Sequence, residues 1–146
     1  MSTDDGVIQR LHHVAMAVES IEQSLGFYRD VLGLSEISIL RVPERGLKVA
    51  LIQVGNCEIE LLEPTTREDN TVRKFLDRRG QGLHHVCFQV AEIDGAMATL
   101  KQRGAEFIEP IARPGAVGLV SFIPPSSAGG VLVELAQVLE EGGHRP

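Results

Sequence analysis

The sequence predicts an α+β fold built from two tandem βαβββ modules, and two internal matches are the main evidence. The stretch LHHVAMAV returns as LHHVCFQV, which pairs His13 with His85 at an offset of 85 − 13 = 72 residues. Later in each half, GNCEIEL returns as GGVLVEL and pairs Glu60 with Glu134 at 134 − 60 = 74 residues. A period this long does not suit a solenoid repeat, so it indicates duplication of one supersecondary unit.

The first module is predicted to begin with a strand over 11–18, because apolar residues alternate along it. A single helix follows up to Gly33, which is the expected C-terminal stop. Its start is indicated by Ser20 with Gln23 three positions later, the pattern of a capping box. Three strands are then expected, over 35–42, 47–54 and 57–63.

The second module repeats this order. Ile93, Met97 and Leu100 fall at helical spacing, and Gly104 is the expected stop. Strands are predicted over 83–90 before this helix and over 105–109, 117–123 and 131–137 after it. The connector 67–82 is expected to carry a helical turn or two around Val72–Leu76. The predicted limits are a tail at 1–8, a single domain at 9–137 with modules at about 9–66 and 80–137, and a tail at 138–146.

The composition excludes several classes of protein. Lys and Arg number 14 against 20 Asp and Glu, a formal charge of −6, which argues against nucleic acid or an anionic membrane as the partner. No apolar run reaches the roughly 20 residues that a membrane helix needs. Cys57 and Cys87 do not make a disulfide scaffold, so a reducing cytoplasm is the expected location.

Four repeat-matched residues are the candidate metal ligands. By strand alternation, His13 and His85 point away from the apolar residues of the first strand of each half, and Glu60 and Glu134 do so in the last strand. All four therefore project from the less apolar face of the sheet. A buried carboxylate pair needs a compensating charge, and a divalent cation supplies it. Imidazoles with carboxylates suit Zn, Co, Ni, Mn or Fe(II).

The order LHHVAMAV, FYRDVLGL, GNCEIELLEP, GLHHVCFQV and GGVLVEL resembles the vicinal-oxygen-chelate superfamily, which includes glyoxalase I and the extradiol dioxygenases. Within it, GNCEIELLEP, RPGAVG and GGVLVEL are most similar to the methylmalonyl-CoA epimerase family. The resemblance covers about 9–137. It implies a cup-shaped mixed sheet around one divalent ion, which we expect to be cobalt, zinc, manganese or nickel. It also implies a homodimer, and its metal ligands carry over to His13, Glu60, His85 and Glu134.

The activity that this resemblance implies is epimerisation of methylmalonyl-CoA by removal and return of the α-proton. A metal would act as Lewis acid, and a positioned carboxylate would shuttle the proton. One branch of the family is similar in using a further Glu in the third strand of the first module, where Val49 stands here. Glu134 or Glu60 is therefore the expected base. The usual His-Pro-Lys-Ser loop is replaced by Pro-Pro-Ser-Ser at 124–127.

An acyl-CoA substrate would bring phosphate charges, so local cations must receive it. The candidate substrate-binding residues are Arg113 and Gly115 in RPGAVG and, in the connector, Arg73 and Lys74. Two alternatives remain open. One is a glyoxalase I-type lactoylglutathione lyase, which needs the same metal and proton shuttle. The other is a metal-free small-molecule-binding module, in which the four residues form a hydrogen-bonded polar floor.

Overall fold

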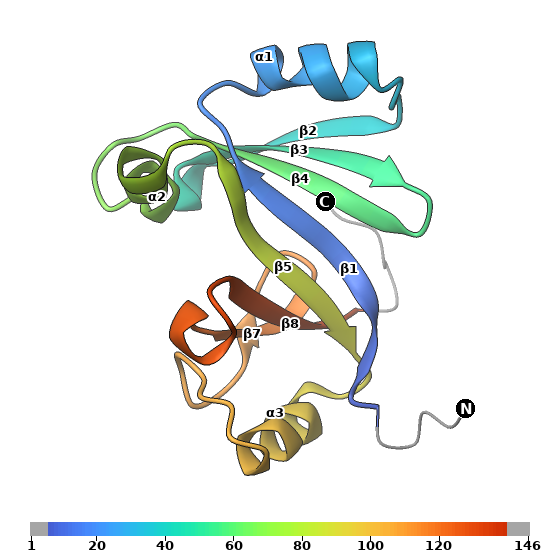
Figure 1. Cartoon of the computed structure of the whole chain (residues 1–146), viewed down its shortest axis with the longest axis vertical. Coiled ribbons are helices and arrows are strands. Elements are labelled where there is room, and N and C mark those ends of the chain that lie inside the picture. Colours follow the sequence, from blue (N-terminus) through green and yellow to red (C-terminus); the bar gives the residue numbers. More distant parts are fainter. Residues whose placement is uncertain (1–5, 140–146) are drawn as a thin grey trace. The chain divides into compact units, whose positions relative to one another are not determined.

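The computed structural model describes residues 6–139 (Figure 1). It divides into two compact units, one formed by His13–His84 and the other by the described residues before His13 together with those from His85 on. The elements in chain order are β1 (Ile8–Ala17), α1 (Ile21–Leu25), the π-helical turn η1 (Gly26–Val31), β2 (Ile37–Val42), the 3-10 turn η2 (Pro43–Arg45), β3 (Leu47–Val54), β4 (Cys57–Pro64), α2 (Thr71–Arg79), β5 (Gly82–Val90), α3 (Ile93–Gln102), β6 (Arg113–Pro114), β7 (Gly118–Ile123), the 3-10 turn η3 (Pro125–Ser127) and β8 (Leu132–Val138).

The unit His13–His84 contains strands in the order β2-β3-β4-β1. β1 runs parallel to β4, and β3 is antiparallel to both of its neighbours. The helix start agrees with the capping signal: the hydroxyl of Ser20 accepts from the backbone N–H of Gln23 at 3.1 Å. A carboxylate oxygen of Glu63 in β4 also accepts from the N–H of Ile21 at 2.8 Å, which fastens the helix to the sheet.

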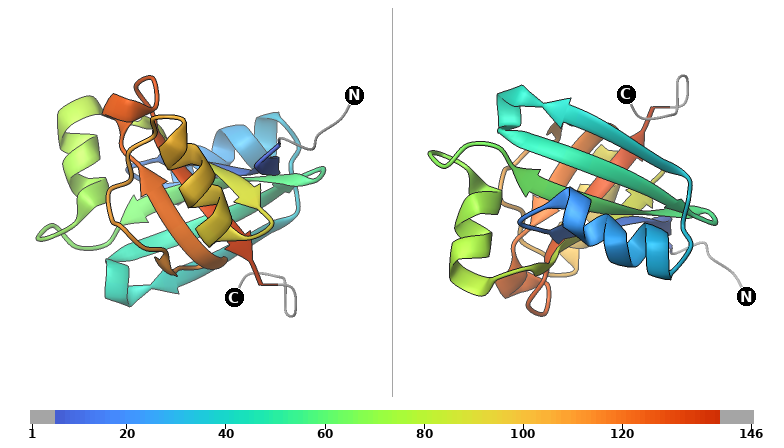
Figure 2. Two further views of the ribbon diagram at one scale, coloured as in Figure 1. Left: turned by 90° about the horizontal axis from the view of Figure 1, so that it is seen from below. Right: turned by 90° about the horizontal axis from the view of Figure 1, so that it is seen from above.

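The predicted single helix up to Gly33 is wrong in its second half, where the α-helix changes into the π-helical turn η1. The N–H of Leu32 bonds to the carbonyl of Phe27, five residues back. The wider turn shifts the register, so Leu32 is exposed while Leu34 packs against the core. Gly33 does end the helix, at a φ of 81° that favours glycine. Figure 2 shows α1 and η1 lying along one face of the sheet of this unit.

The other unit repeats the plan with strands in the order β5-β8-β7-β6. β5 runs parallel to β8, which is antiparallel to β7. The start of α3 repeats that of α1: Glu92 accepts from the N–H of Gly95 at 2.8 Å, and Gln137 of β8 accepts from the N–H of Ile93 at 2.9 Å. The two units therefore use the same pair of caps, one local and one from the last strand.

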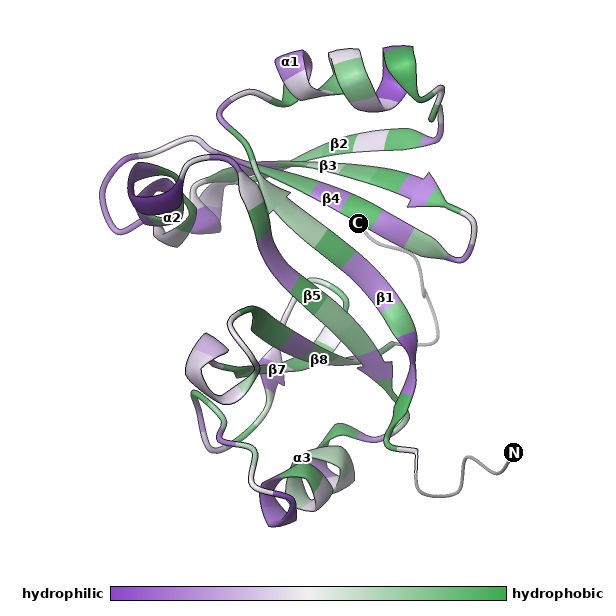
Figure 3. Ribbon diagram, in the orientation of Figure 1, coloured by the Kyte–Doolittle hydropathy of each residue, from purple (hydrophilic) through white to green (hydrophobic). Residues whose placement is uncertain are grey.

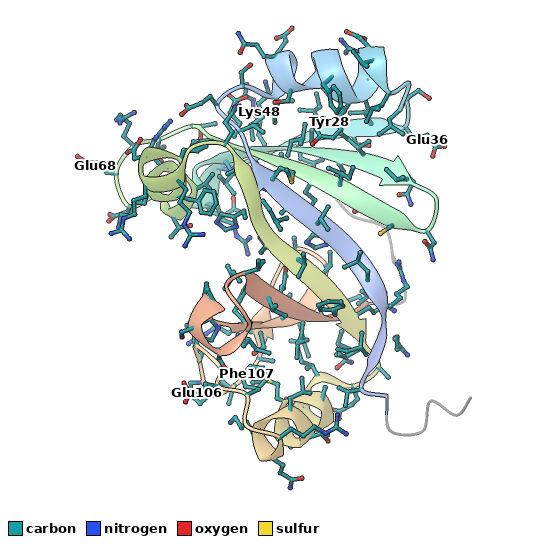
Figure 4. All side chains as sticks on the ribbon, in the orientation of Figure 1. Tyr28, Glu36, Lys48, Glu68, Glu106 and Phe107 are labelled. Carbon is teal, nitrogen blue, oxygen red and sulfur yellow. The ribbon has the colours of Figure 1, made fainter. Side chains whose placement is uncertain are left out.

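The strand predicted over 105–109 is wrong. The chain there is irregular, and Phe107 from this stretch packs against the cluster under α3 (Figure 4). The edge strand is instead the two-residue β6, which pairs with β7. Pro110 and Pro114 lack the N–H groups that a longer ladder would need. The first predicted strand, 11–18, starts three residues after β1 does. The limits of the other predicted strands lie within two residues of the observed ones.

In each unit, both faces of the sheet carry a cluster of buried residues. The face under the first helix carries the cluster that the alternation predicts, around Ile21 and Leu61 in one unit and around Ile93 and Leu135 in the other. The opposite face carries a second cluster in each unit. Its members are Ala15, Ala17, Leu47, Val49, Leu51, Leu62, Val72 and Leu76 in the first unit, and Cys87, Val117, Val120 and Ala136 in the second.

The cover of that second face differs between the units. In the first it is α2, the helix expected around Val72–Leu76, and α2 is hydrophilic over most of its length (Figure 3). Its two buried residues, Val72 and Leu76, are those that pack on the sheet. In the second unit Val117, from the turn between β6 and β7, packs on Cys87 and Ala136. The second unit therefore repeats the strands and the first helix of the first unit, but it has no counterpart of α2 among its described residues.

The predicted N-terminal tail ends at residue 8, where β1 starts, and the predicted C-terminal tail begins at residue 138, where β8 ends. Residues 1–5 and 140–146 of those tails lie outside the described residues. The predicted module limits stay a prediction. Within residues 6–139, no helix has both the length and the apolar character to cross a membrane.

Candidate metal centre

The first half of the candidate site is formed by His13 on β1 and Glu60 on β4. Both are buried, with exposed fractions of 2% and 8%. Glu60 pairs with Ala15, two residues beyond His13, so the two candidate side chains lie on one face of neighbouring strands. The imidazole Nδ1 is 3.5 Å from a carboxylate oxygen of Glu60.

The second half repeats this arrangement with His85 on β5 and Glu134 on β8. Their exposed fractions are 9% and 8%, and Nε2 of His85 is 3.1 Å from a carboxylate oxygen of Glu134. Glu134 pairs with Cys87, which again lies two residues beyond the histidine. Each unit therefore brings together the histidine and glutamate that the repeat predicts, in the same strand register.

The face that carries these pairs is more apolar than the sequence predicts. Ala15 and Ala17 flank the first pair and are fully buried, and Cys87 and Ala136 are fully buried beside the second. Strand alternation identified this face correctly, but it missed the covers that bury it. A buried carboxylate is stabilised by a nearby positive charge, which a bound cation would supply.

The donor sets fit a divalent metal ion. With metal–ligand distances of about 2.0–2.2 Å and about 90–110° between two ligands, donor atoms lie roughly 2.8–3.6 Å apart. The observed N···O separations of 3.5 Å and 3.1 Å fall in this range. Imidazole and carboxylate are also the donor types that Zn, Co, Ni and Mn accept. Each unit thus provides one pair of candidate ligands with suitable chemistry and spacing.

Phe122 is a neighbour of the second pair that sequence reasoning missed. It lies on β7 directly opposite Glu134, and its ring meets the imidazole of His85 edge-on, with centroids 6.4 Å apart and an interplanar angle of 85°. In the first unit the residue opposite Glu60 is Leu51. Extending the repeat alignment to the preceding strand would have revealed this difference.

Among the predicted substrate-binding cations, Arg73 already forms ion pairs with two carboxylates. Its guanidinium donates to both carboxylate oxygens of Glu19, at 3.0 Å and 2.8 Å, and lies 3.1 Å from Asp77. The hydrogen bonds between Arg73 and Glu19 raise the pKa of Arg73 and lower the pKa of Glu19. Arg73 therefore ties α2 to the loop between β1 and α1. Lys74, next along the helix, is exposed.

The predicted loop residues Arg113 and Gly115 shape the hairpin between β6 and β7. Arg113 forms an ion pair with Glu109. The N–H of Gly115 donates to the carbonyl of Gly118 at 2.7 Å, and a Cβ at Gly115 would lie 2.7 Å from a methyl group of Val120. Glycine is therefore required here by close packing, whatever else the loop binds.

Comparison with known families and proteins identifies relatives over most of the chain. The family model for the Glyoxalase/Bleomycin resistance protein/Dioxygenase superfamily matches residues 12–122. The chain is 41% identical over 130 residues to the mitochondrial methylmalonyl-CoA epimerase of Mus musculus, covering 88% of this chain and 72% of that protein. It is 38% identical over 137 residues to the ethylmalonyl-CoA/methylmalonyl-CoA epimerase of Cereibacter sphaeroides, covering 90% and 100%.

Two solved structures give the same result. The methylmalonyl-CoA epimerase from Mycobacterium tuberculosis superposes with a TM-score of 0.84 and 28% identity, covering 97% of this chain and 94% of that one. A methylmalonyl-CoA epimerase in complex with methylmalonyl-CoA and NH4+ superposes with a TM-score of 0.81 and 27% identity, covering 95% and 99%. The predicted α+β fold class and the predicted resemblance are confirmed by these similarities.

Proposed function

Because the chain belongs to the Glyoxalase/Bleomycin resistance protein/Dioxygenase superfamily, we propose that it interconverts (R)- and (S)-methylmalonyl-CoA by abstracting the α-proton. The predicted enzyme class, an isomerase of the epimerase type, is confirmed by relatives named as epimerases. The observation that carries the proposal is the duplicated, buried imidazole–carboxylate pair in one strand register. Superfamily membership alone does not select a reaction, so the residues must carry it.

The two pairs together supply four ligands to one divalent cation, with cobalt, zinc, manganese and nickel as the candidates. The support is chemical: His13, Glu60, His85 and Glu134 are buried, and their carboxylates need a compensating positive charge. When bound, the ion supplies Lewis-acid stabilisation of the negative charge that develops on the thioester oxygen.

Glu134 and Glu60 are the acid–base pair. In the reaction the α-carbon–hydrogen bond breaks, its electron pair delocalises into the thioester as an enolate, and a carboxylate takes the proton. Epimerisation needs a proton returned to the opposite face, and the chain provides one glutamate in each unit for the two steps. Val49, which stands where some relatives carry a further Glu, is buried beneath α2 and supplies no acid–base group.

Glu134 and Glu60 are equally covered, each with an exposed fraction of 8%. Either carboxylate can take the first proton, and the other then holds the second proton position.

The phosphates of coenzyme A meet exposed cations, and Lys74 is the foremost candidate. Arg73 and Arg113, with Gly115 beside it, remain proposed contacts, but Arg73 and Arg113 already bind carboxylates. Lys74 lies on α2, which packs over the face that holds His13 and Glu60. Acidic neighbours compete with phosphate at the two arginines, so their contribution should be smaller than that of Lys74.

The test is exchange of the α-proton of methylmalonyl-CoA in deuterated buffer, followed by NMR with metal-loaded protein. We expect deuterium to enter the α-position and each diastereomer to convert into the other. Glu134→Gln should lose this exchange, while Glu68→Gln, at an exposed position before α2, should retain it. A metal-loaded wild-type protein that exchanges no deuterium would exclude the epimerase function.

A glyoxalase I-type lyase is the second candidate, favoured by one observation. The pair of histidines with two glutamates resembles the ligand set of some glyoxalase I enzymes, and here both glutamates are buried beside a histidine. Turnover of methylglyoxal with glutathione separates the two activities. A metal content far below one ion per chain would instead support the metal-free binding module.

The cytoplasmic location and the homodimer stay predictions. Cys57 and Cys87 are thiols rather than the two halves of a disulfide, which suits a reducing compartment. Sedimentation of the purified protein would test the dimer, and fractionation of the source cells would test the location.

A further inference from the structure

We infer that Phe122 is a positioning residue for the metal ligand His85, whose imidazole it holds with Nε2 directed at Glu134. This inference rests on the proposed metal centre and does not depend on which substrate the protein turns over. All of the residues that carry it belong to one compact unit of the chain.

The first observation is that Phe122 lies beside both members of the pair. It is the strand partner of Glu134 in the β7–β8 ladder, so its side chain rises from the same face beside that carboxylate. Its ring also stands at 85° to the imidazole of His85, with centroids 6.4 Å apart. Such an edge-to-face arrangement is a favourable geometry for two aromatic rings.

The second consideration is the rotational freedom of the imidazole. The outer torsion of a histidine side chain is broad and roughly two-fold, so rotation can turn Nε2 away from its partner. In the structure Nε2 lies 3.1 Å from Oε1 of Glu134. A ring packed against the imidazole removes part of this freedom before any ion binds, which is how supporting residues preorganise a site.

The third observation is that Phe122 is itself held in place. It packs against a cluster whose fully buried members include Cys87 and Ala136, on the face that carries His85. In the other unit, Leu51 occupies the matching strand position opposite Glu60.

The test compares Phe122→Leu with the matched control Phe88→Leu. Phe88 lies on the same strand as His85 but on the opposite face, in the cluster under α3, so its loss removes a ring of the same size away from the pair. We expect Phe122→Leu to weaken Co(II) binding about three- to tenfold by calorimetry, given the strength of an aromatic pair. Its bound-Co(II) absorption spectrum should also change. Phe88→Leu should keep the wild-type affinity and spectrum, even where it lowers the unfolding temperature.

Two further measurements need no folded leucine variant. Phe122→Tyr keeps the ring and should bind Co(II) as the wild type does. In the metal-free wild type, nuclear Overhauser contacts should join the ring protons of Phe122 and His85, and the imidazole nitrogen shifts should report a single ring orientation. A loss of Co(II) affinity in Phe122→Tyr, or several imidazole orientations in the metal-free protein, would contradict the inference.

Several results would overturn the inference. They are wild-type affinity in Phe122→Leu, equal losses in Phe122→Leu and Phe88→Leu, a missing Overhauser contact, and a wild-type protein that binds no Co(II). Failure of the proposed epimerase function would give a different result from failure of this inference. A protein that binds Co(II) with the expected dependence on Phe122 but exchanges no α-proton of methylmalonyl-CoA would refute the epimerase and leave this inference standing.

Discussion

Replacing Asn70 with alanine should destabilise the protein more than any change on the exposed side of α2. Asn70 is 2% exposed and forms the N-cap of α2, where its Oδ1 accepts from the N–H of Arg73 at 3.0 Å. Its amide nitrogen donates to the carbonyl of Gly46 at 2.8 Å and to the hydroxyl of Thr66 at 3.1 Å. One side chain thus joins a turn, a loop and a helix.

The magnitude follows from what each lost bond leaves behind. Loss of the cap leaves the N–H of Arg73 without its partner, which costs about 0.5–2 kcal/mol. The carbonyl of Gly46 still accepts from Thr65 at 2.7 Å, so that bond contributes only about 1 kcal/mol net. With the bond to Thr66, the free energy of unfolding should fall by about 2–4 kcal/mol in Asn70→Ala.

Urea unfolding followed by circular dichroism measures this change. Asn70→Ser should recover about 1 kcal/mol relative to Asn70→Ala, because a serine hydroxyl can still cap α2. Glu68→Ala is the control, since Glu68 projects outward before the helix (Figure 4) and should change stability by less than about 0.5 kcal/mol. If Asn70→Ala were no less stable than Glu68→Ala, the assignment of Asn70 as a structural junction would be wrong.

Three further outcomes are expected. Glu134→Gln should weaken Co(II) binding, measured by calorimetry, by more than about 100-fold. Loss of a residue that only hydrogen-bonds to a ligand costs roughly 10- to 100-fold, and loss of a ligand itself should cost more. Wild-type affinity would show that Glu134 is not a ligand. Glu19 has a pKa lowered by Arg73 from the ordinary value of 4.5, so its pair stabilises the fold above that pH and the contribution is lost as pH falls through the lowered pKa. Glu19→Gln should accordingly flatten the acid limb of the stability profile, and an unchanged limb would contradict this. Gly118→Ala should show little folded protein in a thermal melt, because a Cβ there would overlap the backbone carbonyl oxygen of Gln137. A wild-type melt would refute that packing.

Features set by local sequence or by the internal repeat were predictable. Ser20 caps its helix through a residue three positions away, and strand alternation placed His13 and Glu60 on one face without knowledge of the fold. The repeat then transferred this arrangement to the second half. Each inference used only neighbours along the chain or a comparison of the chain with itself.

Features that depend on distant partners were not predictable. Arg73 carries a charge that suits phosphate, but Glu19, 54 residues away, occupies its guanidinium. The π-helical turn leaves Leu32 exposed, while Leu34 packs against residues from the strands of the same unit. Phe122 acquires its place beside His85 only when β7 pairs with β8.

The stoichiometry of metal binding tests the central proposal, that both units contribute ligands to one ion. Metal-free protein should be titrated with Co(II) by calorimetry, with elemental analysis of the dialysed product. We predict one ion per chain for the wild type and loss of the whole binding event in both His13→Ala and His85→Ala. Two ions per chain, or a variant that loses one binding event and keeps another, would contradict a shared centre. No tight binding at all would exclude the metal site.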